Sequence, residues 1–326
     1  MLSRKFPLVP RVWGAGAACD CGAGAEKQIE GRRRLLVRLQ RMKCFETPLI
    51  FDGGLGTHLE SRGNDISGQL WSAQILRENP AEIQAAHEDF YRAGAQVATT
   101  ASYQVTFDAL GDEAEELLRR SVEVARAAAN NARPDGLVAA SVGPYGAGPG
   151  EGTDYDGAYG LGCEELKHWH QRRIEVLAAT DADFLLAETI PNVDEAAALL
   201  ELLDATGKPY ALSVTGVLAA DPAKVAQVIE FAKQARNLGA LGVNCCDAET
   251  AKGVVKRMRE GIDLPVLAYP NSGETWDHAA RQWRRDEEHS LGLVEAAPQL
   301  RALGVTLLGG CCRTTPEQIR LISQQA

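Results

Sequence analysis

The sequence predicts a single (β/α)8 barrel, or TIM barrel, with an active site at the C-terminal ends of its strands. Three observations predict this fold. From Pro48 onward, eight short apolar runs alternate with eight longer amphipathic stretches. The eight units together span about 280 residues, which is a typical size for such a barrel. The side chains that suggest chemistry stand where the apolar runs end.

The apolar runs are the strand candidates, and the amphipathic stretches between them are the helix candidates. The runs begin at Pro48, Gln96, Leu137, Asp183, Tyr210, Ala240, Pro265 and Val305. Clear helical patterns cover residues 80–95, 112–132, 164–180 and 223–239. A doubly wound sheet is the alternative, but it usually has fewer units and a phosphate-binding fingerprint at its first turn. The glycine-rich stretch at 52–57 lacks the G-x-G-x-x-G spacing and begins with an acidic residue.

The first 41 residues differ in charge from the rest of the chain. They carry nine Lys and Arg residues against three acidic residues, whereas the whole chain has a net charge of −10. Met42, one of three methionines, follows directly. We therefore predict that residues 1–41 are an atypical basic extension outside the fold, either upstream of the working start or a targeting arm. Residues 42–326 are predicted to form the barrel domain.

Charge and composition exclude several classes of protein. The net charge of −10 disfavours nucleic acid and anionic membrane surfaces as partners, because both require a basic face. No run of about 18 apolar residues is present, so no membrane span is expected. Eight cysteines in 326 residues are too few for a secreted disulfide framework. We expect a cytoplasmic protein that acts on small molecules, as a monomer or a homodimer.

The unusual residues fall where a barrel places its chemistry. Active-site groups of such barrels lie at the C-terminal strand ends and on the loops that follow. The first, second, fourth, sixth and eighth runs end at Asp52, Thr100, Glu188, Cys245, and Cys311 with Cys312. The sixth and eighth strands are separated by one strand, so their cysteines are candidates for one site.

The cysteines at the ends of the sixth and eighth runs suggest a catalytic metal centre. Three thiolates around zinc leave a fourth tetrahedral position open, and soft sulfur ligands select zinc over magnesium or calcium. A substrate thiol entering that position would lose its proton and could then attack an electrophilic carbon. Cys44, Cys163 and Cys246 are interpreted as apolar filler, because a buried cysteine is more often filler than ligand.

Seven motifs occur in a characteristic order: FDGGLGTHLE, VATTASYQ, SVGPYGA, LLAETIPN, GVNCC, YPNSGE and GGCCRTTP. In this order the sequence resembles the zinc-dependent homocysteine S-methyltransferases, and most closely the branch that uses S-methylmethionine as methyl donor. The resemblance covers Met42 to the C-terminus. It implies that zinc is held by Cys245, Cys311 and Cys312, and that homocysteine, on the zinc, attacks the donor methyl to form methionine. S-adenosylmethionine is the second donor considered, and betaine serves a related branch.

The resemblance also assigns the substrate contacts. It places the homocysteine ammonium near Asp52 and Glu188. It places the carboxylate near the backbone N–H groups of Gly53, Gly54 and Leu55 and near Thr100. Asn244 is expected to position the loop that carries Cys245 and is counted with the substrate-binding residues. The donor loop follows the third strand and contains Tyr145, Tyr155 and Tyr159, whose ring faces suit a sulfonium cation.

Two other functions remain open at the level of sequence. One is a different barrel enzyme, in which Gly309 and Gly310 after the eighth strand hold a phosphate. The other is a non-catalytic zinc store or sensor, which would have no use for Asp52 and Glu188. The pair His168 and His170 is expected on a solvated helix face, because positions i and i+2 diverge on a helix and chelate poorly.

Overall fold

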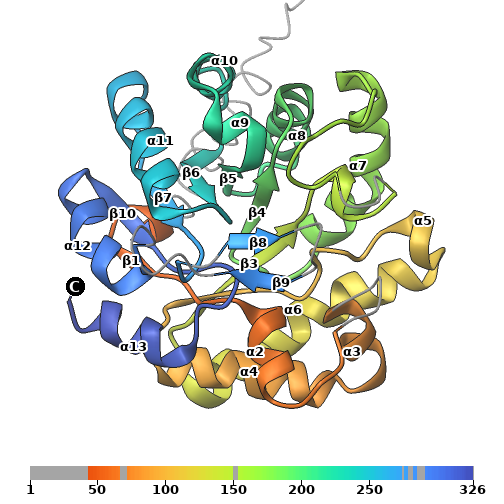
Figure 1. Cartoon of the computed structure of the whole chain (residues 1–326). Helices are drawn as coiled ribbons and strands as arrows, with labels where there is room; N and C mark the ends of the chain where they lie inside the picture. Colours follow the sequence, from red (N-terminus) through yellow and green to blue (C-terminus); the bar gives the residue numbers. More distant parts are fainter. Residues whose placement is uncertain are drawn as a thin grey trace, which may run out of the picture.

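The computed structural model of the chain describes residues 43–66, 72–149, 153–273, 275–277, 282–284 and 291–325. Eight parallel strands in these residues form one sheet in the order β1-β10-β7-β6-β5-β4-β3-β2 (Figure 1). Their bounds are β1 (Leu49–Ile50), β2 (Val97–Thr99), β3 (Leu137–Val142), β4 (Phe184–Ile190), β5 (Tyr210–Val214), β6 (Leu238–Asn244), β7 (Val266–Tyr269) and β10 (Val305–Leu308).

The two ends of the sheet meet and close the barrel. Phe51 forms a parallel bridge with Val97, and the N–H of Gln96 donates to the carbonyl of Ile50 at 2.7 Å. The predicted (β/α)8 barrel is therefore confirmed, and each of the eight predicted runs contains a strand.

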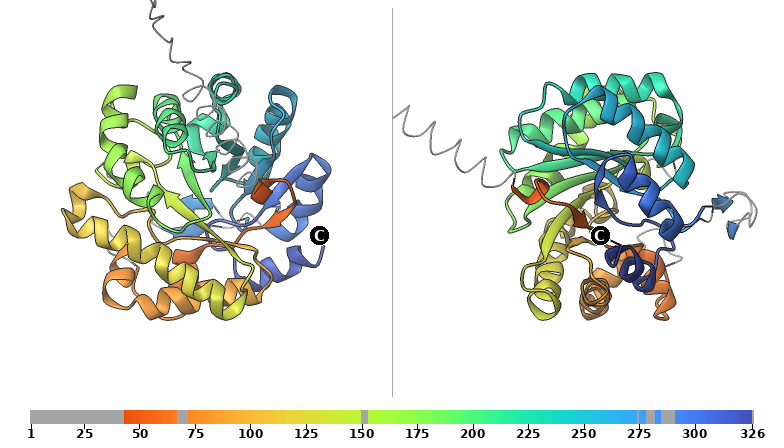
Figure 2. Two further views of the ribbon diagram at one scale, coloured as in Figure 1. Left: turned by 180° about the vertical axis from the view of Figure 1, so that it is seen from behind. Right: turned by 90° about the vertical axis from the view of Figure 1, so that its left-hand side faces the viewer.

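Helices follow every strand and surround the sheet on the outside, as both views in Figure 2 show. This arrangement follows because a parallel strand pair requires a crossover, which packs on the sheet as a helix. The helices are α2 (Leu55–Ser61), α3 (Ser72–Glu78), α4 (Pro80–Arg92), α5 (Phe107–Leu110), α6 (Glu113–Ala132), α7 (Cys163–Ala178), α8 (Val193–Ala205), α9 (Gly216–Ala220), α10 (Pro222–Ala232), α11 (Ala248–Gly261), α12 (Leu293–Ala302) and α13 (Pro316–Ser323), with 3-10 turns η1 (Lys43–Phe45) and η2 (Tyr145–Ala147).

The apolar core has two main layers. The larger layer lies between the sheet and the helices, and a smaller one fills the barrel interior. In the interior, the Phe184 ring contacts the rings of Phe45 and Phe51 at centroid distances of 4.9 and 6.1 Å. Phe45 lies so close to β6 that a Cβ on Gly239 would come within 2.1 Å of its ring. The N-terminal end of the barrel is therefore filled with side chains.

Two local predictions need correction, and one lies outside the described residues. The helix expected over 223–239 ends at Ala232, because Asp204 Oδ1 accepts the N–H groups of Arg236 and Asn237 and turns the chain into β6. A hairpin of β8 (Thr275–Asp277) and β9 (Gln282–Arg284) enters between β7 and α12 and was not predicted. The predicted extension at 1–41 lies outside the described residues.

Among the helices of the described part, none is long and apolar enough to cross a membrane.

Candidate active site

Three cysteine sulfurs meet at the C-terminal mouth of the barrel. The Sγ atoms of Cys245, Cys311 and Cys312 all lie within 4.8 Å of one another, and those of Cys245 and Cys312 are 3.6 Å apart. Cys245 follows β6, and the other two follow β10, on the far side of β7. All three are free thiols. The barrel thus brings together the cysteines that the sequence placed 66 positions apart.

Strained backbone turns the cysteines toward the mouth. Among the described residues, three that are not glycine have a positive φ: Thr189 at 61°, Cys245 at 51° and Arg313 at 62°. Such a conformation costs on the order of 1–3 kcal/mol and persists only where the surroundings impose it. The Cys245 N–H donates to the Tyr269 carbonyl at 3.2 Å, and the Thr215 hydroxyl donates to the Cys245 carbonyl at 3.1 Å. Thr189 lies near the end of β4, Cys245 follows β6 directly, and Arg313 follows the two cysteines after β10.

The three thiols differ in acidity even without a metal. Hydrogen bonds from the Cys311 and Cys312 thiols lower the pKa of Cys245, and the Tyr155 hydroxyl adds a third bond at 3.0 Å. The same interactions raise the pKa of Cys311, together with burial. Cys246 points away and packs against the outer core layer, as expected for filler.

Two buried carboxyl groups stand beside the cysteines. Asp52 accepts the Thr99 N–H at 2.7 Å and the Thr99 hydroxyl at 3.0 Å. Glu188 accepts hydrogen bonds from the hydroxyls of Ser141 and Tyr269. Burial raises the pKa of Asp52 to about 8 and that of Glu188 to about 7. Both groups therefore gain from a cation placed next to them, because an opposite charge offsets the cost of burial.

One cavity of about 150 Å³ joins these groups. It is lined by most of the predicted site residues, namely Asp52, Gly53, Gly54, Leu55, Thr100, Glu188, Cys245, Cys311 and Cys312. Asn244 does not line the cavity. It is fully buried, and its Oδ1 accepts the N–H of Thr189 at 2.9 Å, while its Nδ2 donates to the Thr189 hydroxyl at 2.7 Å. Asn244 thus supports the strained residue Thr189 near the end of β4.

Two of the predicted carboxylate contacts are already engaged within the protein. The Gly54 N–H donates to the Thr314 carbonyl at 3.1 Å. The Thr100 hydroxyl bonds to the Ser102 hydroxyl at 2.7 Å, and Ser102 in turn donates to the Ser141 carbonyl. The Thr100 proton is therefore used in this chain of hydrogen bonds.

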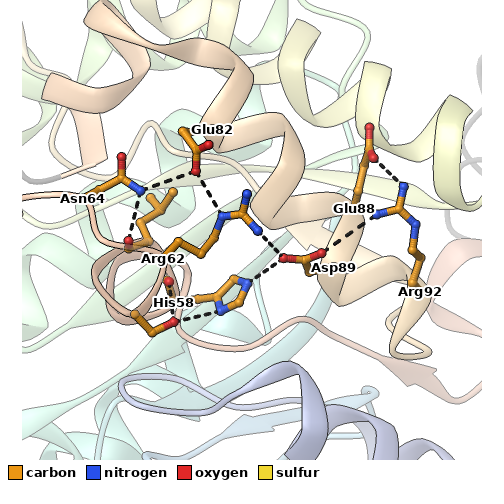
Figure 3. Close-up of polar contacts among 9 residues, drawn as sticks. His58, Arg62, Asn64, Glu82, Glu88, Asp89 and Arg92 are labelled. Carbon is orange, nitrogen blue, oxygen red and sulfur yellow. Dashed lines mark hydrogen bonds and ion pairs between the residues drawn. The ribbon is translucent and has the colours of Figure 1, made fainter.

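Helix α2, which begins at Leu55, is held against α4 by ion pairs and hydrogen bonds (Figure 3). His58 Nε2 lies 3.0 Å from Asp89 Oδ2, and Arg62 contacts the same Asp89 oxygen at 2.8 Å and Glu82 at 3.0 Å. His58 does not line the cavity. It therefore fixes the helix whose N-terminal end borders the site.

Several lining residues were missed by the sequence prediction. They are Tyr103, Gln104, Thr189 and Tyr269. Tyr103, Gln104, Thr189 and Tyr269 lie inside the quoted motifs VATTASYQ, LLAETIPN and YPNSGE, and each follows or ends a strand. Their position near a strand end could have marked them as candidates. The sequence does not show, however, that their side chains point into the cavity.

The fold and the site together define the class: a (β/α)8 barrel whose mouth carries three thiols and two buried carboxyl groups. Comparison with known proteins is more specific. A family model described as homocysteine S-methyltransferase matches residues 49–326. The homocysteine S-methyltransferase of Escherichia coli (strain K12) is 40% identical over 294 residues, which is 85% of this chain and 95% of that protein. The selenocysteine Se-methyltransferase of Brassica oleracea var. italica is 39% identical over 307 residues, covering 85% of this chain and 88% of that protein.

A solved structure agrees with these relatives. The metallated form of the homocysteine methyltransferase MmuM from Escherichia coli matches with a TM-score of 0.75 and 36% identity, over 86% of this chain and 96% of that chain. The chain belongs to the homocysteine S-methyltransferase family, whose members are methyltransferase enzymes.

Proposed function

We propose that this protein transfers a methyl group from S-methylmethionine, or as second choice S-adenosylmethionine, to the sulfur of L-homocysteine and so forms methionine. The observation that carries the proposal is the shared cavity, in which three thiols face two buried carboxyl groups. A substrate with both a thiol and an ammonium group matches both halves of this cavity. The names of the relatives support the same substrate.

The three cysteines fit a zinc ion. In the described residues they are the one His, Cys, Asp or Glu group close enough to hold a metal, and three protein ligands leave a position for substrate. Soft thiolate ligands favour zinc over magnesium or calcium. When bound, zinc supplies the Lewis acidity that keeps a substrate thiol ionised at neutral pH. The hydrogen bonds of Tyr269 and Thr215 to the backbone of Cys245 hold that ligand in place.

The remaining contacts bind and orient homocysteine. Asp52 and Glu188 receive the ammonium group, and each carboxyl is already fixed by hydroxyl or amide donors, so little reorganisation is needed on binding. The N–H groups of Gly53 and Leu55 bind the substrate carboxylate. Those of Gly54 and Thr100 already donate to carbonyls within the protein. Asn244 acts from beneath through Thr189.

The donor occupies the side of the cavity formed by Tyr103, Asp154 and Tyr155. A sulfonium carries a fixed positive charge, and aromatic faces together with a carboxylate stabilise such a cation. Methyl transfer then needs an in-line approach of sulfur to the methyl carbon, which the residues supply by orientation. The thioether leaves as a neutral molecule, so the chain needs no general acid.

The two alternative functions fit the structure less well. The N–H groups of Gly309 and Gly310 donate to the carbonyls of Ala268 and Asp52, so they do not form a phosphate cradle. A zinc store would leave two buried carboxyl groups without a cation. Their burial would then cost free energy that no opposite charge offsets. We place the enzyme in the cytoplasm, where the free thiols stay reduced, with residues 42–326 as the working domain.

The test is a donor panel with the full-length protein. Homocysteine is combined separately with S-methylmethionine, S-adenosylmethionine and betaine, methionine is quantified, and metal content is measured on the same preparation. We expect one zinc per chain and methionine formation that depends on S-methylmethionine. Zinc without methionine from any donor would leave a metal-binding protein and refute the methyltransferase proposal.

A further inference from the structure

The two neighbouring histidines on α7 have different environments. His168 is exposed, but His170 is fully buried. The expectation of a solvated face is therefore wrong for His170. Its position two residues along the helix turns it by roughly 200°, from the outside to the inside. His170 thus lies in the packed layer behind the predicted donor loop, where a polar side chain needs a specific partner.

That partner is Glu195, which is also fully buried. His170 Nε2 lies 2.9 Å from Glu195 Oε1. Glu195 stands in the first turn of α8, and its own N–H bonds to the side chain of the N-cap residue Asn192 at 3.1 Å. The Arg173 side chain, 1% exposed, lies on the same helix as His170; burial lowers its pKa, and the nearby Glu195 opposes that fall. Burial of a carboxyl group costs free energy unless its oxygens have partners, so the contacts of Glu195 indicate what it stabilises.

Glu195 holds the loop after β3 near both of its ends. Its Oε1 accepts the N–H of Tyr145 at 2.6 Å. Tyr159 is close enough for the carboxylate, after burial, to raise the pKa of its hydroxyl. The Tyr159 hydroxyl and Glu195 Oε2 are both buried without a hydrogen-bond partner. They are complementary as donor and acceptor, and they influence each other electrostatically.

Other described residues of the loop pack around these two points. The Tyr145 ring contacts the rings of Tyr159 and Trp169 at 5.2 and 5.0 Å. The Tyr155 carbonyl accepts the N–H of Val217 at 3.0 Å, and the Tyr155 hydroxyl reaches Cys245. Tyr155 therefore lies in sequence between Tyr145 and Tyr159, and its hydroxyl contacts one of the three proposed metal ligands.

We propose that Glu195, supported by His170, is a positioning residue for the methyl donor. It holds Tyr145 and Tyr159 so that Asp154 and Tyr155 keep the donor side of the cavity in shape, and it touches neither substrate. This inference rests on the proposed function, because it assigns the loop to the donor. It predicts that losing Glu195 weakens donor use and leaves homocysteine use unchanged.

The test compares Glu195→Ala, Glu195→Gln and the control Asp194→Ala in the full-length protein. Asp194 is the exposed neighbour in the same turn of α8. In steady-state assays, we expect Glu195→Ala to raise the KM for the donor about tenfold, as for the loss of one or two hydrogen bonds, with the KM for homocysteine and the metal content unchanged. Glu195→Gln keeps an acceptor for Tyr145 and should recover most of the donor KM. Asp194→Ala should match the wild type.

Four outcomes would overturn the inference. An unchanged donor KM in Glu195→Ala, or an equal rise in both KM values, means that Glu195 does not act on the donor. If Glu195→Ala does not fold, Tyr159→Phe takes its place, and an unchanged donor KM there counts against the inference. If the wild type makes no methionine, the proposed function fails by itself. The rate of chymotrypsin cleavage after Tyr145 and Tyr159 then tests whether Glu195 anchors the loop. Cleavage of Glu195→Ala that is no faster than that of Asp194→Ala refutes the anchoring role.

Discussion

Two segments that border the barrel mouth are held by polar contacts of different burial. On one flank, α2 is tied to α4 by the pairs of His58 and Arg62 with Asp89, where the Arg62 and Asp89 side chains are 29% and 32% exposed. On the other flank, the loop after β3 is tied to α8 through His170 and Glu195, both 0% exposed. Both networks position a segment that borders the same cavity.

The difference in burial predicts a difference in tolerance. A partly exposed ion pair contributes about 0–1 kcal/mol and weakens with salt, because water competes for both charges. Burial lowers the pKa of His170, so its contact with Glu195 is a buried hydrogen bond. Removal of one partner leaves the other without a hydrogen bond in the core, which costs about 1–3 kcal/mol. Substitutions on the α2 flank should therefore change activity slightly, and those on the loop flank should change it strongly and selectively.

The largest effect is expected at the centre that the two flanks share. Cys311→Ser removes one of three sulfur ligands, so we expect loss of the bound metal and a fall in methionine formation of more than about a hundredfold, whichever substrate is varied. Metal analysis and initial rates measure this. Cys246→Ser is the matched control, because Cys246 packs against the outer core. Full metal content in Cys311→Ser would remove Cys311 from the ligand set.

Next in size is the substitution of a single buried carboxyl group. Asp52→Asn loses the charge. Its amide oxygen can still accept the Thr99 N–H, and its NH2 group can donate to the Thr99 hydroxyl, which now becomes the acceptor. If Asp52 receives the homocysteine ammonium, the KM for homocysteine should rise about tenfold or more, as for a lost charge-assisted bond, and the donor KM should stay the same. This is the inverse of the pattern expected for Glu195→Ala. A rise in the donor KM alone would mean that Asp52 contacts the donor and not homocysteine.

A smaller effect concerns pH and the stability of the metal-free protein. Burial raises the pKa of Asp52 to about 8, from an ordinary value of 3.8. The folded protein therefore keeps a proton that the unfolded chain releases, so this stabilisation is complete below about pH 4 and is lost as the pH rises through about 8. We expect the Tm of the wild type to fall between pH 5 and pH 9 by more than that of Asp52→Asn. Parallel Tm curves would contradict the buried, protonated state.

The smallest effect is expected on the α2 flank. Arg62→Ala removes two partly exposed contacts, so the free energy of unfolding should fall by about 1 kcal/mol or less, and both KM values should stay within about twofold. Urea unfolding at low and high salt measures the difference, which should shrink at high salt. A loss as large as that of Glu195→Ala would show that exposure does not separate the two networks.

The sequence was sufficient for the architecture and for most of the candidate site. Strand and helix periods are local properties, so the eight units could be read directly, and strand ends in a barrel converge on one mouth. This placed Asp52, Glu188 and the three cysteines beside one cavity, as the structure has them. The hairpin β8–β9 was missed because two three-residue strands carry too little periodicity to be recognised.

Side-chain direction and hydrogen-bond partners were decided only by the tertiary structure. Local pattern cannot tell that Cys245 adopts a left-handed conformation, since Tyr269 and Thr215 from neighbouring strands impose it. Nor can it tell that His170 is buried, because its partner Glu195 lies on the next helix. The sequence by itself determined which residues gather at the mouth, through strand order and period. Only packing between distant segments decided which of their atoms remain free to bind substrate, because each hydrogen bond within the protein removes a donor or acceptor from the cavity.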